Sequence, residues 1–461
     1  METSWTSVAW ELLLPAVRAP RRQRRRLLES ALRDAIRAGH VAAGTRLPAS
    51  RALADDLGVS RGLVTAVYDQ LRAEGYVEGR PGAGTYAAPG LAVPAPPGGA
   101  PAGPTAAGAA RVDFRPGQAD PRLFPRAAWA GLYRQVLTGA PDRALSYGDP
   151  RGVPELRAAL ADLLARRRGV VTDPDRIVVC GGVAQAFSLV SRALAAAGHD
   201  TVAVEDPGPP ELAMLARTNG LRPVPVDVGA HGPDLTGVPA RAALVTPAHQ
   251  FPTGIAYPPA TRAALVRWAS TVDGLLIEDD YDGDFRYDRA PVGALQGLGP
   301  DRVAYAGSVS KSLASGLRLG WLALPDRLTD PVVDLKRADD LCGPVLEQRT
   351  LAAFLTTGRY DAHLRRCQRT YRARRDVLVA AVRRYLPAAR ITGIAAGLHA
   401  VLVLPGGDEA ALTAAAEAAG VRVLPLRHYG SGPSPGFVVG YAHLTPDTIT
   451  NTVATLAVAW R

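Results

Sequence analysis

The stretch Gly307-Ser308-Val309-Ser310-Lys311-Ser312-Leu313-Ala314-Ser315-Gly316-Leu317-Arg318-Leu319-Gly320 contains one of the chain's rare lysines. The protein has 53 lysines and arginines, and only Lys311 and Lys336 are lysines. Arginine cannot lose its proton to form an imine with a carbonyl, whereas lysine can. A lysine among serines and glycines, in a chain that otherwise uses arginine, therefore predicts covalent chemistry at Lys311.

The sequence on both sides of this stretch alternates short apolar runs with helical patterns. The predicted strands include residues 177–179, 201–204, 243–245, 275–277 and 303–305. Fully apolar strands separated by helices predict a mostly parallel sheet covered on both faces. From about residue 346 the pattern changes to a long helix, followed by strands at 398–404 and 436–441. This second pattern predicts a smaller α/β domain.

Polar residues follow two of these strands. The run Ile277-Glu278-Asp279-Asp280-Tyr281 places carboxylates at the end of an apolar strand, where ligands gather in open α/β sheets. The run Gly181-Gly182-Val183-Ala184-Gln185 follows another strand and opens a helix, whose N-terminus can bind a phosphate. Both runs predict a ligand site near Lys311.

The stretch 307–320 resembles the lysine segment of fold-type I aminotransferases, which bind pyridoxal phosphate (PLP). That cofactor needs an amine for its Schiff base, an acid beside its ring nitrogen, and hydroxyls and a cation for its phosphate. The resemblance implies that Lys311 forms the Schiff base, that Asp279 pairs with the ring nitrogen and that Tyr281 reaches the ring oxygen. The remaining cofactor residues implied are Ser308, Ser310, Arg318, Ala184, Gln185 and, lent by the partner subunit, Tyr147.

Three positions depart from the aminotransferase pattern. The family has Asn-Pro-Thr-Gly, whose asparagine bonds the ring oxygen, where this chain has His249-Gln250-Phe251-Pro252-Thr253-Gly254. Gln250 or His249 could substitute for that asparagine, but Phe251 cannot. Pro209 stands where an aromatic residue usually stacks on the ring, and the strand 436–442 has valine in place of the arginine that clamps the substrate carboxylate. These departures predict a cofactor site without its usual amino-acid anchor.

Residues 89–110 separate this region from a basic N-terminal part. They comprise 6 Pro, 5 Gly and 8 Ala in 22 residues with no charge, which predicts a linker. The predicted domains are therefore 1–88, 111–345 (large) and 346–461 (small). The net charge is +10, and residues 18–80 hold 13 arginines against 7 acids, which favours a polyanionic partner.

The N-terminal part has the pattern of three helices and a hairpin. An amphipathic helix is predicted over 24–38, a short helix over 50–57, and a third helix capped by Ser60. The spacing of apolar residues in the third helix leaves Arg61 and Thr65 together on its outer face. Two short strands, 76–78 and 85–87, flank a glycine-rich turn, so the order predicts a winged helix-turn-helix.

The segment 44–61 closely resembles the GntR family of winged-helix repressors, and the resemblance continues to residue 87. It implies that the third helix enters the major groove of operator DNA and that the wing approaches the minor groove. Gly62 departs from the family, which often has a longer polar residue there. The DNA-binding residues implied are Arg46, Arg51, Ser60, Arg61, Thr65, Arg80, Gly82, Gly84 and Thr85.

The two resemblances together match the MocR-type subfamily of GntR regulators, which fuse this DNA reader to an aminotransferase-like domain. The fold class expected is α/β multidomain, with a winged helix-turn-helix before a fold-type I domain. The function expected is a homodimeric transcription regulator that binds double-stranded operator DNA. Its effector would be PLP or a PLP–amine adduct, and its target genes would serve vitamin B6, amino-acid or amine metabolism.

Two rival functions are open at this point. One is an active PLP-dependent aminotransferase with a DNA-binding appendage. The other is a DNA-binding scaffold whose cofactor site Pro209 and Phe251 have disabled. No apolar run approaches the ~20 residues needed to span a bilayer. Three widely spaced cysteines favour reduced thiols. We therefore expect a cytoplasmic protein with no membrane segment and no metal site.

Overall fold

The structure, a computed structural model, describes residues 16, 19–89, 112–288, 292–432 and 435–461. It divides into two compact units, Met1–Ala107 and Gly108–Arg461. The predicted linker lies outside the described residues except for Pro89. The boundary predicted at residues 345 and 346 stays a prediction.

The first unit consists of three helices and a hairpin. Its elements are α2 (Arg21–Arg37), α3 (Ser50–Leu57), α4 (Arg61–Ala73), β1 (Val77–Arg80) and β2 (Gly84–Ala87). The predicted helix over 50–57 is confirmed, and Leu32, Leu53, Val64 and Leu71 are fully buried between the helices. The hairpin pairs Val77 with Ala87, so its strands extend further into the glycine turn than predicted.

The second unit is built on an eight-stranded sheet. Its strand order is β4 (Ile177–Cys180), β11 (Gly320–Ala323), β10 (Val303–Ser308), β9 (Leu275–Asp279), β8 (Ala242–Val245), β5 (Thr201–Asp206), β6 (Arg222–Gly229) and β7 (Gly232–Pro233). The strands from β10 to β6 are parallel, as predicted. β11 is antiparallel to both of its neighbours and was not predicted, so the sheet is mixed.

Helices cover both faces of this sheet, as the apolar strands predicted. Val178 packs with α7 (Val183–Ala196), α8 (Pro210–Thr218) and α10 (Asp326–Asp340) on one face. Its neighbour Val179 packs on the other face in a separate core. That face is covered by α5 (Arg126–Gly139), α6 (Pro154–Arg168), α9 (Pro259–Thr271), α11 (Val345–Thr356) and α12 (Arg359–Tyr385).

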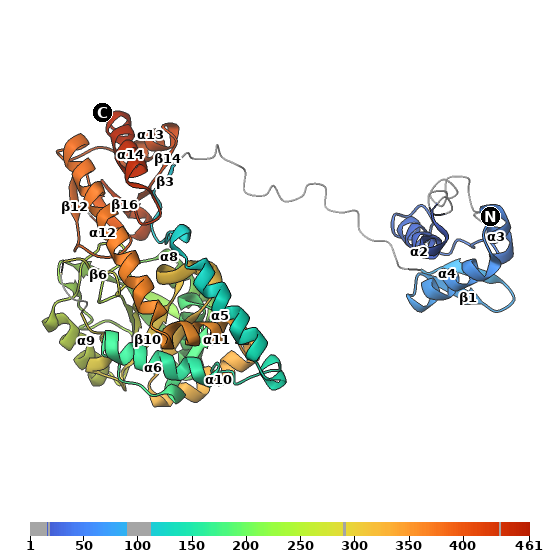
Figure 1. Ribbon diagram of the computed structural model, residues 1–461, viewed down its shortest axis with the longest axis horizontal. Helices are drawn as coiled ribbons and strands as arrows, with labels where there is room; N and C mark the ends of the chain where they lie inside the picture. The colour runs from blue at the N-terminus through green and yellow to red at the C-terminus, as the bar shows by residue number, and fades with distance from the viewer. Residues whose placement is uncertain (1–15, 17–18, 90–111, 289–291, 433–434) are drawn as a thin grey trace. The chain divides into compact units, whose positions relative to one another are not determined.

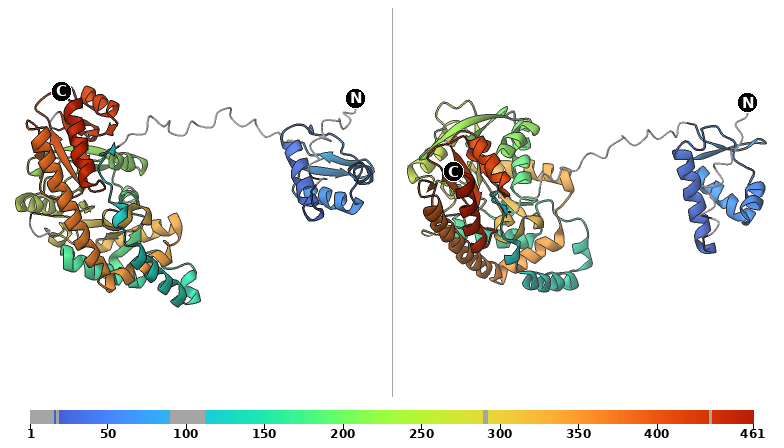
Figure 2. Two further views of the ribbon diagram at one scale, coloured as in Figure 1. Left: turned by 45° about the horizontal axis from the view of Figure 1, so that its top comes forward. Right: turned by 90° about the horizontal axis from the view of Figure 1, so that it is seen from above.

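A second sheet lies in the C-terminal part, in the order β12 (Arg390–Thr392), β13 (His399–Val403), β16 (Gly436–Gly440) and β15 (Leu424–Pro425). The single long helix predicted from residue 346 is wrong: α11 and α12 are separate. Gly358 interrupts them with a φ of +70°, a conformation that glycine adopts without strain. α12 then lies beside α14 (Pro446–Ala459), as Figures 1 and 2 show.

Shorter elements connect these layers. They are β3 (Val112–Asp113), η1 (Pro121–Leu123), η2 (Asp142–Leu145), η3 (Pro174–Arg176), η4 (Gln296–Leu298), η5 (Ser310–Ala314), η6 (Ser315–Leu317), α13 (Glu409–Ala418), β14 (Val421–Arg422) and η7 (Leu426–Tyr429). Among the described residues, no helix is long and apolar enough to cross a membrane.

Candidate functional site: a DNA-reading unit and a lysine cavity

The N-terminus of α4 is arranged as the sequence predicted. The hydroxyl of Ser60 caps the helix by accepting a hydrogen bond from the backbone N–H of Leu63 at 3.3 Å. Arg61 and Thr65 are exposed, and Val64 between them is buried. A Cβ added to Gly62 would contact nothing within 4 Å, so the first turn of α4 has room for a close partner.

Arg46 and Arg80 both lie against the wing hairpin. Arg46 forms a β-bridge with Tyr86, and its guanidinium lies where a Cβ on Gly84 would approach it to 3.2 Å. The guanidinium of Arg80 lies 4.4 Å from the centre of the Tyr86 ring and pairs with Glu78 at 2.7 Å. The hairpin therefore holds two exposed cations close to its glycine-rich tip.

The remaining predicted DNA contacts lie on the helices and at the wing tip. Arg51 and Arg61 are exposed and form no ion pair with any other described residue. Gly82 and Gly84 have φ values of +74° and +114°, which shape the tip, and Thr85 is half-buried. The role of each residue toward DNA stays a prediction.

Lys311 lies in the π-helical turn η5 between β10 and β11. Its ammonium group donates a hydrogen bond to the carbonyl of Gly117 at 2.5 Å. Burial lowers the pKa of Lys311, although the charges of Asp282 and Asp279 oppose that change. A lowered pKa increases the fraction of neutral amine, the form that attacks a carbonyl. Lys336 differs, since it is fully buried and pairs with Asp340 at 2.5 Å.

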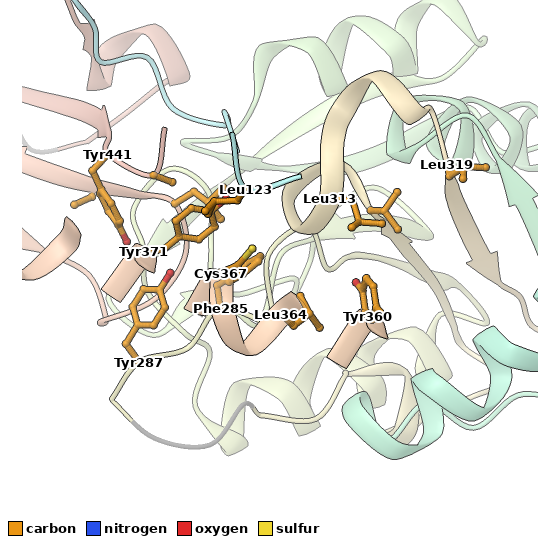
Figure 3. Packing of buried hydrophobic residues seen from close by; sticks show 14 of the residues in the cluster. Leu123, Phe285, Tyr287, Leu313, Leu319, Tyr360, Leu364, Cys367, Tyr371 and Tyr441 are labelled. Atoms are coloured by element: carbon orange, nitrogen blue, oxygen red, sulfur yellow. The ribbon is translucent and has the colours of Figure 1, made fainter. Parts of the chain in front are cut away.

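Side chains of α12 pack against the turn that carries Lys311. Figure 3 shows Leu313 of this turn near Tyr360 and Leu364 of α12. Leu313 is buried in the core beside Tyr360 and Leu364. The hydroxyl of Tyr360 donates to the Ser312 hydroxyl at 3.0 Å, and Nε2 of His363 contacts the Ser312 carbonyl at 2.6 Å. These contacts hold the backbone on both sides of Ser312, so the lysine side chain starts from a rigid base.

Asp279 ends β9 and is only 9% exposed. Its Oδ1 is buried and has no hydrogen-bond partner among the described residues. Burial and repulsion by Asp280 raise the pKa of Asp279 to about 7, against the attraction of Lys311. A buried carboxylate without a partner is costly, so this position is suited to a ligand that brings a donor.

The polar side chains in and around the loop 249–254, which replaces the family's Asn-Pro-Thr-Gly, form hydrogen bonds with other protein groups. The hydroxyl of Tyr281 donates to the His249 carbonyl at 2.8 Å, and Nδ1 of His249 lies 2.9 Å from Asp282. The Gln250 amide donates to Glu205, and its oxygen accepts from the Thr253 hydroxyl. The expectation that Gln250 could take the place of the asparagine is therefore wrong, because its polar atoms already bond to Glu205 of β5 and to Thr253.

Lys311, Asp279 and Tyr281 line a cavity of about 420 Å³. Among the described residues that line it, Lys311 is the only lysine or arginine. Phe251 lines the cavity where the family has asparagine. The complete lining is Pro116, Gly117, Val183, Pro209, Glu211, Phe251, Asp279, Tyr281, Asp282, Ser308, Ser310, Lys311, Leu398, His399 and Tyr429.

Three predicted phosphate residues lie outside this lining. Ala184 is exposed in the first turn of α7, and the Gln185 side chain turns back to accept from the Gly181 backbone N–H at 2.6 Å. The structure therefore gives no support for a side-chain role of either residue. Arg318 lies against Gly182, where an added Cβ would be 3.2 Å from its guanidinium. A cation thus lies at the N-terminus of α7, the end suited to anions.

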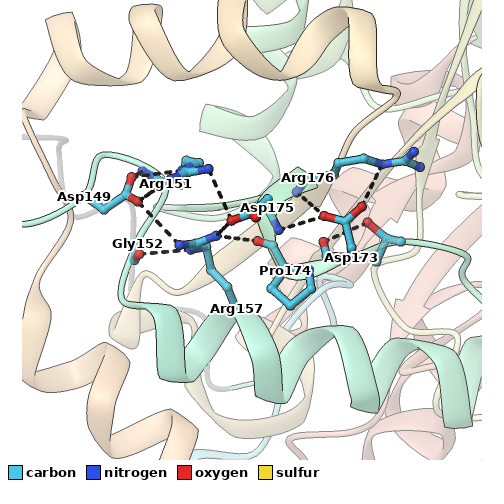
Figure 4. A network of polar contacts seen from close by, with 9 residues as sticks. Asp149, Arg151, Gly152, Arg157, Asp173, Pro174, Asp175 and Arg176 are labelled. Carbon is cyan, nitrogen blue, oxygen red and sulfur yellow. Dashed lines mark hydrogen bonds and ion pairs between the residues drawn. The ribbon is translucent and has the colours of Figure 1, made fainter.

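Tyr147 is 83% exposed and does not line the cavity of its own chain. The loop that carries it is anchored by an ion-pair network, drawn in Figure 4. Asp149 pairs with Arg151 at 2.8 Å and with Arg157 at 3.4 Å, and Arg157 also pairs with Asp175 at 2.9 Å. The tyrosine is therefore exposed on a firmly held loop.

Several residues that line the cavity were not predicted from the sequence. Glu211, Leu398, His399 and Tyr429 come from three separate segments, and none follows a recognised motif. His399 is buried and its Nε2 has no partner among the described residues. Gly117 offered a signal, because the run Asp113-Phe114-Arg115-Pro116-Gly117 also resembles the MocR-type subfamily. Its φ is +85°, and a Cβ there would lie 3.3 Å from the Lys311 ammonium.

Comparison with known proteins gives two family matches. The family "Aminotransferase class I and II" matches residues 116–456, and "Bacterial regulatory proteins, gntR family" matches residues 25–87. The chain is 34% identical over 463 residues to the probable rhizopine catabolism regulatory protein MocR of Rhizobium meliloti, covering 94% of this chain and 93% of the relative. It is 31% identical to the pyridoxine biosynthesis transcriptional regulator PdxR of Corynebacterium glutamicum, with 92% of each chain covered.

Solved aminotransferases share the fold of the second unit. One is LysN, the α-aminoadipate aminotransferase of Thermus thermophilus, complexed with N-(5'-phosphopyridoxyl)-L-leucine. It has a TM-score of 0.68 and 26% identity, over 76% of this chain and 91% of that chain. An archaeal alanine:glyoxylate aminotransferase has a TM-score of 0.68 and 27% identity, over 75% and 89%. The fold class expected from the sequence is confirmed.

Proposed function

Because this chain belongs to the aminotransferase class I and II family and joins that domain to a GntR-family reader, as MocR-type regulators do, we propose a specific function. It is a sequence-specific transcription regulator that binds operator DNA through its first unit and PLP, as effector, through its second. Relatives named as regulators of rhizopine catabolism and pyridoxine biosynthesis support target genes in amine or vitamin B6 metabolism.

The observation that carries the proposal is the unpartnered Oδ1 of Asp279 beside Lys311. The residues present fit PLP: Asp279 would accept from its ring nitrogen, and Lys311 would bind its aldehyde. Its phosphate would lie at Ser308, Ser310 and the α7 N-terminus, next to Arg318. When bound, the cofactor supplies an electrophilic carbonyl and an electron-withdrawing ring.

We further propose that the regulator is a homodimer. Tyr147 is exposed on its anchored loop, and Leu145 beside it is 62% exposed. Large exposed side chains on a fixed loop favour an interface with another chain. In a dimer, Tyr147 of one chain would reach the phosphate held by the other.

An active aminotransferase is the second candidate function, and the cavity argues against it. Transamination needs the substrate held so that its Cα–H bond is aligned, and an arginine normally fixes its carboxylate. Val438 is fully buried in an apolar cluster against Phe251 and Tyr429, and Lys311 is the only lysine or arginine among the described lining residues. The described residues that line the cavity thus include groups suited to the cofactor but, apart from Lys311, no lysine or arginine for a substrate carboxylate.

The test is an operator titration of the full-length protein with and without saturating PLP. We expect PLP to change operator affinity by about 5- to 150-fold, the usual scale of coupling between linked sites. Linkage requires operator DNA to change PLP affinity by the same factor. The Lys311→Ala variant should lose this response, whereas Ser315→Ala, at an exposed position next to η5, should keep it. Identical titration curves together with rapid turnover of amino donors would favour the enzyme.

A further inference from the structure

Two loops form the rim of the cavity and are bonded to each other. Glu211 lies in the first turn of α8, and Tyr429 ends η7. The Gly208 backbone N–H donates to the Tyr429 carbonyl at 2.8 Å, and the Ser431 N–H donates to Asp206 at 2.7 Å. Glu211 and Tyr429 therefore keep their places relative to each other.

When the residues that would bind PLP are set aside, the cavity lining has a carboxylate, Glu211, that no described lysine or arginine of the lining balances. Asp279 and Lys311 are the groups that would bind PLP. Asp282 is already paired with His249 at 2.9 Å. Glu211 forms no ion pair or hydrogen bond with another residue in the part of the chain that the structure describes, so its carboxylate is available at the rim.

Two arginines lie next to or near lining residues in the sequence, and both form ion pairs. Arg115, next to Pro116, pairs with Asp113 at 2.6 Å. Arg427 of η7 pairs with Glu409 at 3.1 Å. Each guanidinium is thus paired with a carboxylate other than Glu211, and neither arginine lines the cavity.

Aromatic rings complete the rim. The rings of Phe251 and Tyr429 meet edge to face with their centres 5.0 Å apart. Glu211 and Tyr429 both line the cavity. Burial and then the charge of Glu211 raise the pKa of Tyr429, and the charge of Arg115 opposes this change. An ammonium group gains both from a carboxylate and from aromatic faces, whereas a carboxylate would be repelled.

From this pattern we infer that the ligand filling the cavity beside the cofactor is a short organic diamine, whose outer ammonium binds Glu211 against Phe251 and Tyr429. The inference rests on the proposed function, because the cofactor occupies the Lys311 end of the cavity. An amino acid would place its carboxylate in the same rim, and no described lysine or arginine other than Lys311 lines the cavity. The ligand class thus follows from the charges of the described residues that line the cavity.

The test uses full-length protein saturated with PLP and isothermal titration calorimetry. The probes are 1,3-diaminopropane, 1,4-diaminobutane and 1,5-diaminopentane, with butylamine and 4-aminobutanoate for comparison. We expect the best diamine to bind about fivefold more tightly than butylamine, the upper range for a solvent-exposed ion pair. Glu211→Gln should remove that difference and leave butylamine binding unchanged.

A matched control comes from α6. Pro154-Glu155 begins α6 as Pro210-Glu211 begins α8, so each glutamate lies in the first turn of its helix, where a negative charge is favourable. Glu155 pairs with Arg349 at 3.1 Å and lies outside this cavity. Glu155→Gln should keep the diamine preference. Tightest binding by 4-aminobutanoate, or a preference that survives Glu211→Gln, would overturn the diamine inference alone. Absence of the cofactor's visible absorption band in the wild type would overturn the proposed function as well.

Discussion

Replacing Asp279 by asparagine should stabilise the cofactor-free protein, although the residue lies at the centre of the site. The side chain keeps its shape and loses a buried charge that has no hydrogen-bond partner at Oδ1. Its pKa is about 7 in the folded chain against 3.8 for an ordinary aspartate. That difference corresponds to at most about 4 kcal/mol of folding free energy, at about 1.4 kcal/mol per pH unit.

The sign of the pH dependence follows from where each state ionises. Below pH 3.8 Asp279 is protonated in both states and contributes nothing. Between pH 3.8 and about 7 the unfolded chain ionises first, so stability falls as the pH rises, and above about 7 the loss is complete. The gain from Asp279→Asn should therefore be largest at pH 8 and less than half as large at pH 5.

Urea unfolding of the PLP-free protein, followed by tryptophan fluorescence, measures this gain. Four of the six tryptophans, Trp129, Trp268, Trp321 and Trp460, belong to the second unit, so the Trp5→Phe/Trp10→Phe background makes the signal report the domain in question. Asp280→Asn is the contrasting control, because that carboxylate pairs with Arg168 at 2.6 Å and accepts from Tyr305. Loss of the Asp280 charge leaves Arg168 buried without its partner, which should lower the free energy of unfolding by about 3–5 kcal/mol. An Asp279→Asn protein less stable than wild type at pH 8 would refute the reasoning. With PLP present the gain should shrink by about 1.5–3 kcal/mol, since the variant loses a charge-assisted hydrogen bond to the cofactor.

Three further predictions concern the other groups. Arg61→Ala should weaken operator binding by about 1–3 kcal/mol in a gel-shift titration, whereas Arg72→Ala, which removes an arginine paired with Asp69, should have little effect. Lys311→Ala should lose the visible absorption band that saturating PLP produces, and a band that persists would contradict covalent attachment. Leu313→Ala should lower the free energy of unfolding by about 2–5 kcal/mol, measured in urea, because the side chain is 2% exposed in the core.

The parts of the site that the sequence predicted are those encoded in contiguous runs. Asp279 ends a parallel strand, and Lys311 follows the next strand in the sheet, so strand order alone brings them to one edge. The winged helix was equally predictable, because its caps and apolar spacing are local. The helix break at Gly358 was not, since a single glycine in a helical pattern gives an ambiguous signal.

The rest of the cavity could not be predicted because it is assembled from distant segments. Glu211 and Tyr429 are more than 200 residues apart and meet through backbone hydrogen bonds of their neighbours. Gln250 is next to Phe251 in the sequence and so was expected to be available. Its side-chain amide donates to Glu205 of β5, however, and its side-chain oxygen accepts from Thr253. Local sequence specifies which groups are present, whereas only the packing of loops decides which remain free.

The division of the cavity between two sheets explains how a cofactor site can persist while its ligand preference changes. The groups suited to the cofactor, Asp279 and Lys311, belong to the eight-stranded sheet and the turn after it. Val438 belongs to the four-stranded sheet, and Tyr429 follows its strand β15. A substitution in the second group leaves the strands that position the first group unchanged. A carboxylate clamp can therefore be absent from the second sheet without disturbing the cofactor's anchors. Glu211 reaches the rim from α8, which packs on the eight-stranded sheet. Regulation requires only that a ligand bind one conformation better than another, so the substrate alignment that catalysis needs is dispensable.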